Sequence, residues 1–277
     1  MACLLWQNGS VLPKKPTSSR KPIKPEPVKL VNQEPAPQAY RNAAPVVHHF
    51  MSAISKRDWD DFSALPAEGP AILVSNHLSS IDAFVLADYT VYHGRWPYFL
   101  SKNEVFNWPL FGRFMKAIDA IPVYRGTERA GEALIEAENR LAQGKVVALA
   151  PEGTTAFDPH LWPMATKTGA ARLAMTTGAP VIPIGHWGAS TLCPDNKGPQ
   201  RVPHLIPRPW VTVRSGQPID LGAFGTDVND RDAVRGAATT ILGGIIKQVE
   251  LARGEAAPPL VYSLRTKTYV PLEEAIW

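Results

Sequence analysis

Residues 69–82, GPAILVSNHLSSID, decide the fold of this chain of 277 residues. After a glycine and a proline, Ala71–Ser75 is a short apolar run of the kind found in strands that are buried on both faces. A helix is predicted over residues 81–92, with Ser79 or Ser80 as its N-cap. A buried strand that leads through a turn into a helix is the repeating unit of a parallel α/β sheet.

The same alternation of strands and helices continues along the chain. Strands are predicted at Tyr98–Ser101, Ala120–Tyr124, Val146–Ala150, Val181–Ile184 and Val211–Arg214, and helices at Pro109–Lys116, Glu128–Gln143, Thr168–Thr177 and Asp227–Arg253. Pro183 indicates that its strand lies at an edge or is about to end. The expected fold class is α/β, a single domain over residues 45–277 with a mainly parallel sheet flanked by helices.

The N-terminal part of the chain differs from the rest in composition. Residues 1–45 hold seven basic and two acidic side chains and eight of the 27 prolines, whereas the other 232 residues hold 22 basic and 23 acidic ones. Because large apolar residues are scarce there, we expect residues 1–44 to be a disordered basic extension. The net charge of +4 therefore belongs to this extension, which could attract anionic lipid, dock to a partner or act as a solvated linker, and the body is not expected to bind nucleic acid.

Several classes of protein are excluded by what the sequence lacks. Two cysteines cannot form a disulfide framework, and no C-x-x-C pair is present, which fits a reducing compartment. No apolar run approaches the ~18 residues of a membrane-spanning helix, and the first residues make a poor signal peptide. The histidines show no metal-ligand spacing. We expect a cytoplasmic protein without a metal or cofactor that meets a membrane from one side.

Two apolar segments allow more than one interpretation. Val46–Ile54 has helical spacing, and we favour a helix that covers the sheet over one that lies on a membrane. The segment 106–116 is dense in aromatic residues. It could pack in the core, line a groove for an acyl chain or enter the bilayer interface.

The turn after the first strand carries a possible catalytic pair. His77 is followed five residues later by Asp82, and a tight turn can place the carboxylate beside one imidazole nitrogen. The carboxylate would then stabilise the imidazolium and leave the other nitrogen free as a general base. Because no G-x-S-x-G nucleophile motif is present, this pair favours direct attack by a hydroxyl of the substrate. A turn histidine beside a helix-capping aspartate is the alternative.

A second loop follows another buried strand. Pro151-Glu152-Gly153-Thr154-Thr155 combines a glycine, which lets a ligand approach the backbone, with two hydroxyls that can bind an anionic oxygen. A solvated loop would look similar when taken alone.

The order of these blocks resembles that of the glycerolipid acyltransferases of the lysophosphatidate (1-acylglycerol-3-phosphate) acyltransferase family. The similarity covers about residues 60–220. It rests on an H-x-x-x-x-D motif, Lys102-x-Glu104 with Gly112, Ile121–Gly126, Pro151–Thr154 and Val181–Gly185, each after a predicted strand.

The resemblance implies a reaction and a role for each block. His77 would take a proton from a lysophospholipid hydroxyl, Asp82 would orient His77, and the acyl donor would be acyl-CoA or acyl carrier protein. Lys102 and Arg125 would hold the glycerol phosphate, and Glu152, Gly153 and Thr154 would build the acceptor site. The implied product is phosphatidate, made in phospholipid biosynthesis at the inner face of the cell membrane.

Thr155 departs from the family pattern, in which an arginine usually follows Glu-Gly-Thr. Arginine binds phosphate through two charge-assisted hydrogen bonds, whereas threonine offers one hydroxyl. Either Lys102, Arg125 and Lys167 replace the missing arginine in binding the phosphate, or the acceptor is a lipid other than lysophosphatidate. Two further alternatives keep the fold without the chemistry: a lipid- or acyl-CoA-binding protein, and a membrane scaffold.

Overall fold

The computed structural model describes residues 27–195 and 202–277. Seven strands form the central sheet in the order β1-β7-β6-β2-β5-β3-β4. All neighbouring pairs are parallel except β6 and β7, which are antiparallel. The strands are β1 (Lys56–Trp59), β2 (Ala71–Ser75), β3 (Pro97–Lys102), β4 (Ile121–Val123), β5 (Val146–Leu149), β6 (Val181–Trp187) and β7 (Trp210–Ser215).

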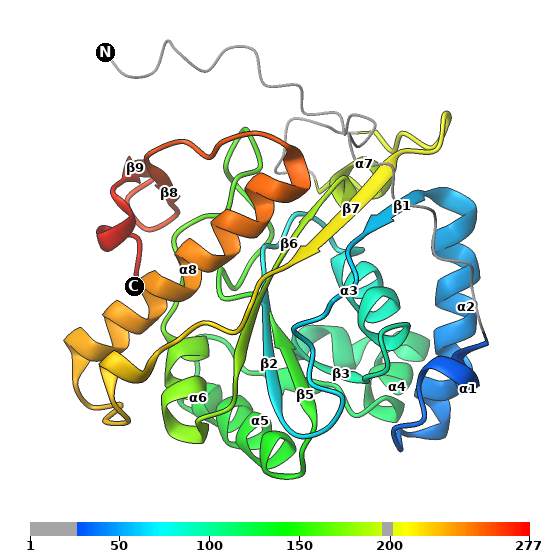
Figure 1. The fold of residues 1–277 in the computed structure, drawn as a ribbon, viewed down its shortest axis with the longest axis horizontal. Coiled ribbons are helices and arrows are strands. Elements are labelled where there is room, and N and C mark those ends of the chain that lie inside the picture. The colour runs from blue at the N-terminus through cyan, green and yellow to red at the C-terminus, as the bar shows by residue number, and fades with distance from the viewer. Residues whose placement is uncertain (1–26, 196–201) are drawn as a thin grey trace.

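Helices cover both faces of the sheet (Figure 1). The helices α5 (Glu132–Ala142), α6 (Gly169–Thr177) and α8 (Arg231–Arg253) pack on one face, and α2 (Gln38–Ile54) and α3 (Asp82–Val91) on the other, with α4 (Pro109–Ala117) beside α2. Shorter elements are α1 (Val28–Val31), α7 (Ala189–Leu192), a hairpin of β8 (Val261–Ser263) and β9 (Thr268–Val270), and 3-10 turns at Asn103–Asn107, Glu128–Gly131, Gly222–Phe224 and Leu272–Glu274. The predicted α/β class with a mainly parallel sheet is confirmed.

The long helix α8 forms despite its three glycines. The Asp230 side chain caps its first turn by accepting hydrogen bonds from the backbone N–H groups of Asp232 and Ala233. Gly185 of β6 explains how closely the helix approaches the sheet, since a Cβ there would lie 2.2 Å from the backbone of Gln248. Burial of the apolar face of α8 against β6 therefore outweighs the low helix propensity of glycine.

The predicted edge position of Pro183 is wrong, because β6 lies between β2 and β7. The Pro183 carbonyl accepts a hydrogen bond from the backbone N–H of Gly216 at 2.9 Å. The nitrogen and carbonyl of one strand residue point to the same side. The N–H that proline lacks would therefore point toward Gly216. The pairing of β6 with β7 begins only at Ile184, so the ladder does not need an N–H at position 183.

The predicted boundary at residue 44 is also wrong. The helix α2 begins at Gln38, and the Tyr40 hydroxyl donates to the Pro97 carbonyl at 2.7 Å. The Glu34 carboxylate pairs with the guanidinium of the buried Arg95 at 3.2 Å. A few well-placed contacts thus order residues 27–44 although their average composition resembles that of a linker. Residues 1–26 lie outside the described residues, so the basic extension stays a prediction for them.

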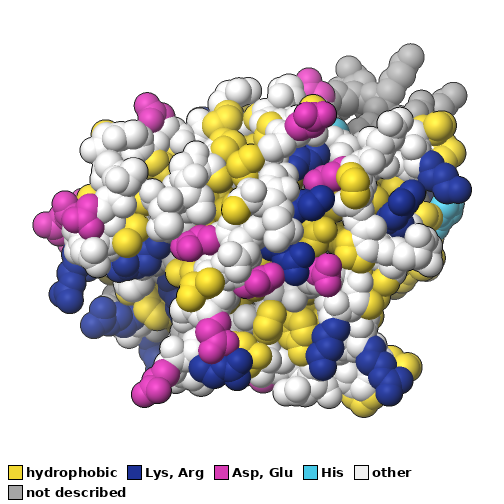
Figure 2. All heavy atoms as spheres, turned by 90° about the horizontal axis from the view of Figure 1, so that it is seen from below, with side chains coloured by type: hydrophobic (Ala, Val, Ile, Leu, Met, Phe, Trp, Pro, Cys, Tyr) yellow, Lys and Arg dark blue, Asp and Glu magenta, His cyan; other side chains and the backbone are white. Residues whose placement is uncertain are grey.

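One face of the molecule is chemically mixed. Figure 2 shows one face on which basic, acidic and hydrophobic side chains are interspersed, as expected for a body with nearly balanced charges. Across the described ranges 27–195 and 202–277, none of the helices is both long and apolar enough to span a bilayer.

Candidate active site

The parallel strands β2, β3, β4 and β5 bring the predicted residues to one edge of the sheet. His77 follows β2, Lys102 ends β3, Arg125 follows β4, and Thr154 and Thr155 follow β5. All five line one cavity of about 350 Å³. Ligands of open α/β sheets bind at this carboxyl edge of the strands.

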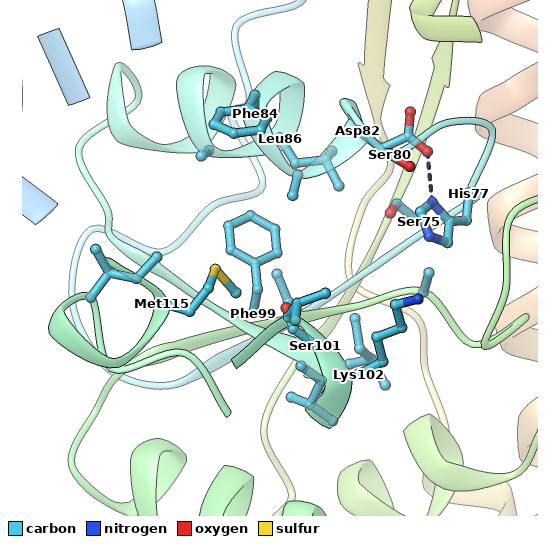
Figure 3. Close-up of a pocket in the computed structure, with 18 of the residues that line it drawn as sticks. Ser75, His77, Ser80, Asp82, Phe84, Leu86, Phe99, Ser101, Lys102 and Met115 are labelled. Atoms are coloured by element: carbon cyan, nitrogen blue, oxygen red, sulfur yellow. Dashed lines mark hydrogen bonds and ion pairs between the residues drawn. The ribbon is translucent and has the colours of Figure 1, made fainter. Parts of the chain in front are cut away.

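His77 and Asp82 form a hydrogen-bonded pair at the cavity wall (Figure 3). The distance from His77 Nδ1 to Asp82 Oδ2 is 2.8 Å, and the same oxygen accepts the backbone N–H groups of Leu78 at 2.6 Å and Ser79 at 2.9 Å. Asp82 is thus fixed at the first residue of α3 and holds the proton on Nδ1. Among the described residues, Asp82 is the hydrogen-bond partner of this ring, which leaves His77 Nε2 as an available base.

The predicted serine cap of this helix is not observed. Neither Ser79 nor Ser80 is the N-cap of α3, which is Ile81 without a side-chain cap. The Asp82 carboxylate instead accepts hydrogen bonds from the turn before the helix, so the turn is organised around the His77–Asp82 pair.

Asn76 and His186 are hydrogen-bonded to each other next to the His77–Asp82 pair. The Asn76 amide donates to the His186 carbonyl and accepts the His186 backbone N–H, both at 3.0 Å, and His186 Nε2 lies 3.0 Å from the Asn76 carbonyl oxygen. Burial lowers the pKa of His186, whose Nε2 is 3.7 Å from Asp82 Oδ2. The sequence offered no signal for this contact, because Asn76 follows β2 and His186 lies on β6, 110 positions further along the chain.

Glu152 contacts the backbone of His77 and does not line the cavity. It is 2% exposed, and its carboxylate accepts the backbone N–H groups of His77 at 3.0 Å and Met164 at 3.2 Å. Burial raises the pKa of Glu152 to about 8. Its geometry supports a role in positioning the His77 backbone, in place of the part in building the acceptor site that the family resemblance implied.

The loop after Glu152 brings a basic side chain over its glycine. Gly153 has a positive φ of 69°, and a Cβ there would lie 3.4 Å from Lys167 Cε. Burial and the nearby Arg125 lower the pKa of Lys167. The ammonium of Lys167 also lies 4.8 Å from the ring centroid of Trp277. Lys167 and Gly153 are therefore adjacent to the cavity without lining it.

The cavity has a polar end and an apolar end. In Figure 3, Lys102 reaches toward His77, while Leu86, Phe99 and Met115 gather farther from the pair. The apolar end is completed by side chains of α2 and α4, including Ala44 and Phe111. Such a shape suits a ligand with one polar head and one long apolar chain.

The two ambiguous apolar segments contribute to this apolar end. The cavity is lined by Val47 of α2 and by Phe111, Phe114 and Met115 of α4. At the N-terminal end of α4, Trp108 and Leu110 are 56% and 82% exposed. The segment 106–116 thus both lines the groove and presents apolar side chains to the surroundings.

Comparison with known proteins agrees with this geometry. Residues 58–187 match a family model described as Acyltransferase. A chloroplastic 1-acyl-sn-glycerol-3-phosphate acyltransferase of Brassica napus is 30% identical, over 53% of this chain and 44% of the relative. The chain therefore spans less than half the length of that relative.

Two other proteins are matched more completely. A lyso-ornithine lipid O-acyltransferase of Rhizobium meliloti is 29% identical, over 68% of this chain and 71% of the relative. The crystal structure of the 1-acyl-sn-glycerophosphate (LPA) acyltransferase PlsC from Thermotoga maritima superposes with a TM-score of 0.58 at 19% identity, covering 79% of this chain and 83% of that one. At this identity the structural likeness shows a shared fold.

Proposed function

We propose that this chain, whose residues 58–187 match the Acyltransferase family model, transfers a fatty acyl group from a thioester donor to a hydroxyl of a lysophospholipid. The observation that carries the proposal is the His77–Asp82 pair, at 2.8 Å, in a cavity with cations at one end and apolar side chains at the other. The relatives named as 1-acylglycerol-3-phosphate acyltransferases support lysophosphatidate as one acceptor and phosphatidate as its product.

The proposed reaction is a direct transfer. His77 Nε2 takes the proton from the acceptor hydroxyl, and the oxygen attacks the thioester carbonyl of acyl-CoA or acyl carrier protein. Asp82 stabilises the imidazolium that forms. When the tetrahedral intermediate collapses, the carbon–sulfur bond breaks, and His77 returns its proton to the departing thiolate. These steps require no metal, cofactor or covalent acyl-enzyme.

The cations of the site support an anionic group on the acceptor. Lys102 and Arg125 line the cavity, and Lys167 is close enough to Arg125 for the two charges to interact. Within residues 27–195 and 202–277, none of the three pairs with an acidic side chain. Grouped cations without counter-charges favour a bound phosphate or carboxylate. Lys102, Arg125 and Lys167 therefore compensate in part for the arginine that Thr155 replaces.

We also propose that the protein works at the cytoplasmic face of the cell membrane. Trp108 and Leu110 at the start of α4, and Val46 and Phe50 of α2, are exposed apolar side chains on two helices that contact each other. Both helices also line the apolar end of the cavity. A membrane contact here would let a lipid chain enter the cavity without crossing water.

The test is acyl transfer by the purified chain. Acyl-CoA and a lysophospholipid are mixed with the protein in detergent micelles, and release of free thiol and the acylated lipid are followed. His77→Ala should abolish transfer and leave the unfolding temperature nearly unchanged, because the His77 side chain is 29% exposed. A folded His77→Ala variant with normal turnover would refute the mechanism. Acyl-CoA binding without transfer by the unaltered protein would favour the alternative of a lipid-binding protein.

A further inference from the structure

A carboxylate on the cavity wall has no part in the reaction described above. Asp195 lines the same cavity as His77, Lys102 and Arg125. The hydroxyl of Thr155 donates a hydrogen bond to its side chain. The cavity thus carries an acidic group at the position where the sequence departs from the family pattern.

The segment that carries Asp195 is attached to the turn of the catalytic pair. The Ser79 hydroxyl donates to the carbonyl of Cys193, two residues before Asp195. Ser79 also donates its backbone N–H to Asp82 at 2.9 Å. Thr155 of the loop after β5 thus binds Asp195 itself, and the turn after β2 binds the chain two residues before it.

The charges on the cavity wall are not neutralised by one another. In the described part of the chain, Asp195 pairs with no basic side chain, and Lys102 and Arg125 pair with no acidic one. Each of these groups loses hydration when a ligand fills the cavity, and an unpaired charge in such a place is costly. A ligand that carries both signs of charge would compensate all three groups, whereas a purely anionic head group would leave Asp195 unpaired and be repelled by it.

We propose that the preferred acceptor is a lysolipid whose head group carries a protonated amine beside its anionic group. Asp195 binds the amine, and Lys102 and Arg125 bind the anionic group. This inference rests on the proposed acyl transfer and narrows its acceptor. Thr155 acts as a positioning residue, because its hydroxyl orients the Asp195 carboxylate.

The experiment compares two acceptors that differ in the amine. Lysophosphatidylethanolamine and lysophosphatidylglycerol share the phosphodiester, but only the first carries an ammonium group. With the full chain and acyl-CoA, kcat/KM should be about tenfold higher for lysophosphatidylethanolamine, the size expected of one charge-assisted hydrogen bond. The kcat/KM for lysophosphatidate, which also lacks an amine, should likewise be lower than that for lysophosphatidylethanolamine.

Variants connect this preference to Asp195. Asp195→Asn should reduce the ratio of the two kcat/KM values to about one, mainly by lowering the value for the amine-bearing lipid, and Thr155→Val should reduce the ratio in part. The matched control Glu68→Gln removes an exposed carboxylate outside the cavity and should leave the ratio unchanged.

The outcomes separate this inference from the function on which it rests. Transfer to both lipids at equal rates by the unaltered protein, or an unchanged ratio in Asp195→Asn, would overturn the head-group assignment and leave the acyltransferase intact. If Asp195→Asn loses activity toward both lipids equally while it stays folded, the carboxylate is only structural, and the assignment also fails. No transfer to any of the three lipids would refute the proposed function itself.

Discussion

Replacing Glu152 with glutamine should make the free energy of unfolding less dependent on pH. The Glu152 carboxylate is buried, accepts two backbone N–H groups and has a pKa raised by burial from 4.5 to about 8. Between these two values the folded protein keeps a proton that the unfolded chain releases. By linkage, this residue stabilises the fold most at low pH, and its contribution declines as pH rises toward 8.

The size of the effect follows from the two pKa values. With 1.36 kcal/mol per pKa unit, the contribution of Glu152 to the free energy of unfolding falls by about 3 kcal/mol between pH 5.5 and pH 8. Glutamine cannot ionise, so Glu152→Gln should lack this decline. Its amide oxygen can still accept the His77 N–H, but its NH₂ group cannot accept the Met164 N–H, which costs about 1–3 kcal/mol at every pH.

Urea unfolding at pH 5.5 and pH 8 measures the decline in each protein. The expected result is a decline that is smaller in Glu152→Gln by about 3 kcal/mol, with equal m-values in the two proteins. Glu68→Gln, which removes an exposed carboxylate, controls for the loss of one surface carboxylate. Equal declines in the unaltered protein and in Glu152→Gln would show that Glu152 titrates normally, and the argument from its burial would be refuted.

Two further substitutions address catalysis and chain length. Asp82→Asn keeps the shape of the pair but cannot stabilise the imidazolium, so kcat should fall about 100-fold, less than in His77→Ala; an unaffected kcat would remove Asp82 from the mechanism. Met115→Trp narrows the apolar end of the cavity and should shift the preference among acyl-CoA donors toward shorter chains, while Lys116→Ala on the exposed side of the same helix should not. An unchanged donor profile in Met115→Trp would place the acyl chain elsewhere.

The sheet and the contact between His77 and Asp82 could be predicted because their signals are local. The run of Ala71–Ser75 identifies a buried strand by itself, and His77 and Asp82 are separated by one turn. The family resemblance implied that Lys102, Arg125 and Thr154 belong to one site, and the structure places all three on one cavity because the parallel strands that precede them end at the same edge.

Contacts between distant segments could not be predicted in this way. The pairing of Asn76 with His186 depends on β2 and β6 being neighbours, which periodicity does not determine. The burial of Glu152 under His77 likewise depends on the three-dimensional course of the loop, because a glutamate after a strand is usually solvated. Pro183 can occupy a central strand because a missing N–H excludes such a position only where the partner strand needs that N–H.

The N-terminal boundary has the largest consequence for function. Composition placed residues 38–44 in a disordered extension, yet Tyr40, Ala43 and Ala44 line the cavity from α2. The Tyr40 hydroxyl binds the Pro97 carbonyl at the start of β3, so the helix is tied to the sheet. Removing residues 1–44 would therefore open the apolar end of the cavity and impair acyl transfer whatever the basic segment does. A truncation that examines the basic segment alone has to end before Pro27, and only such a variant can separate an effect on membrane attachment from damage to the site.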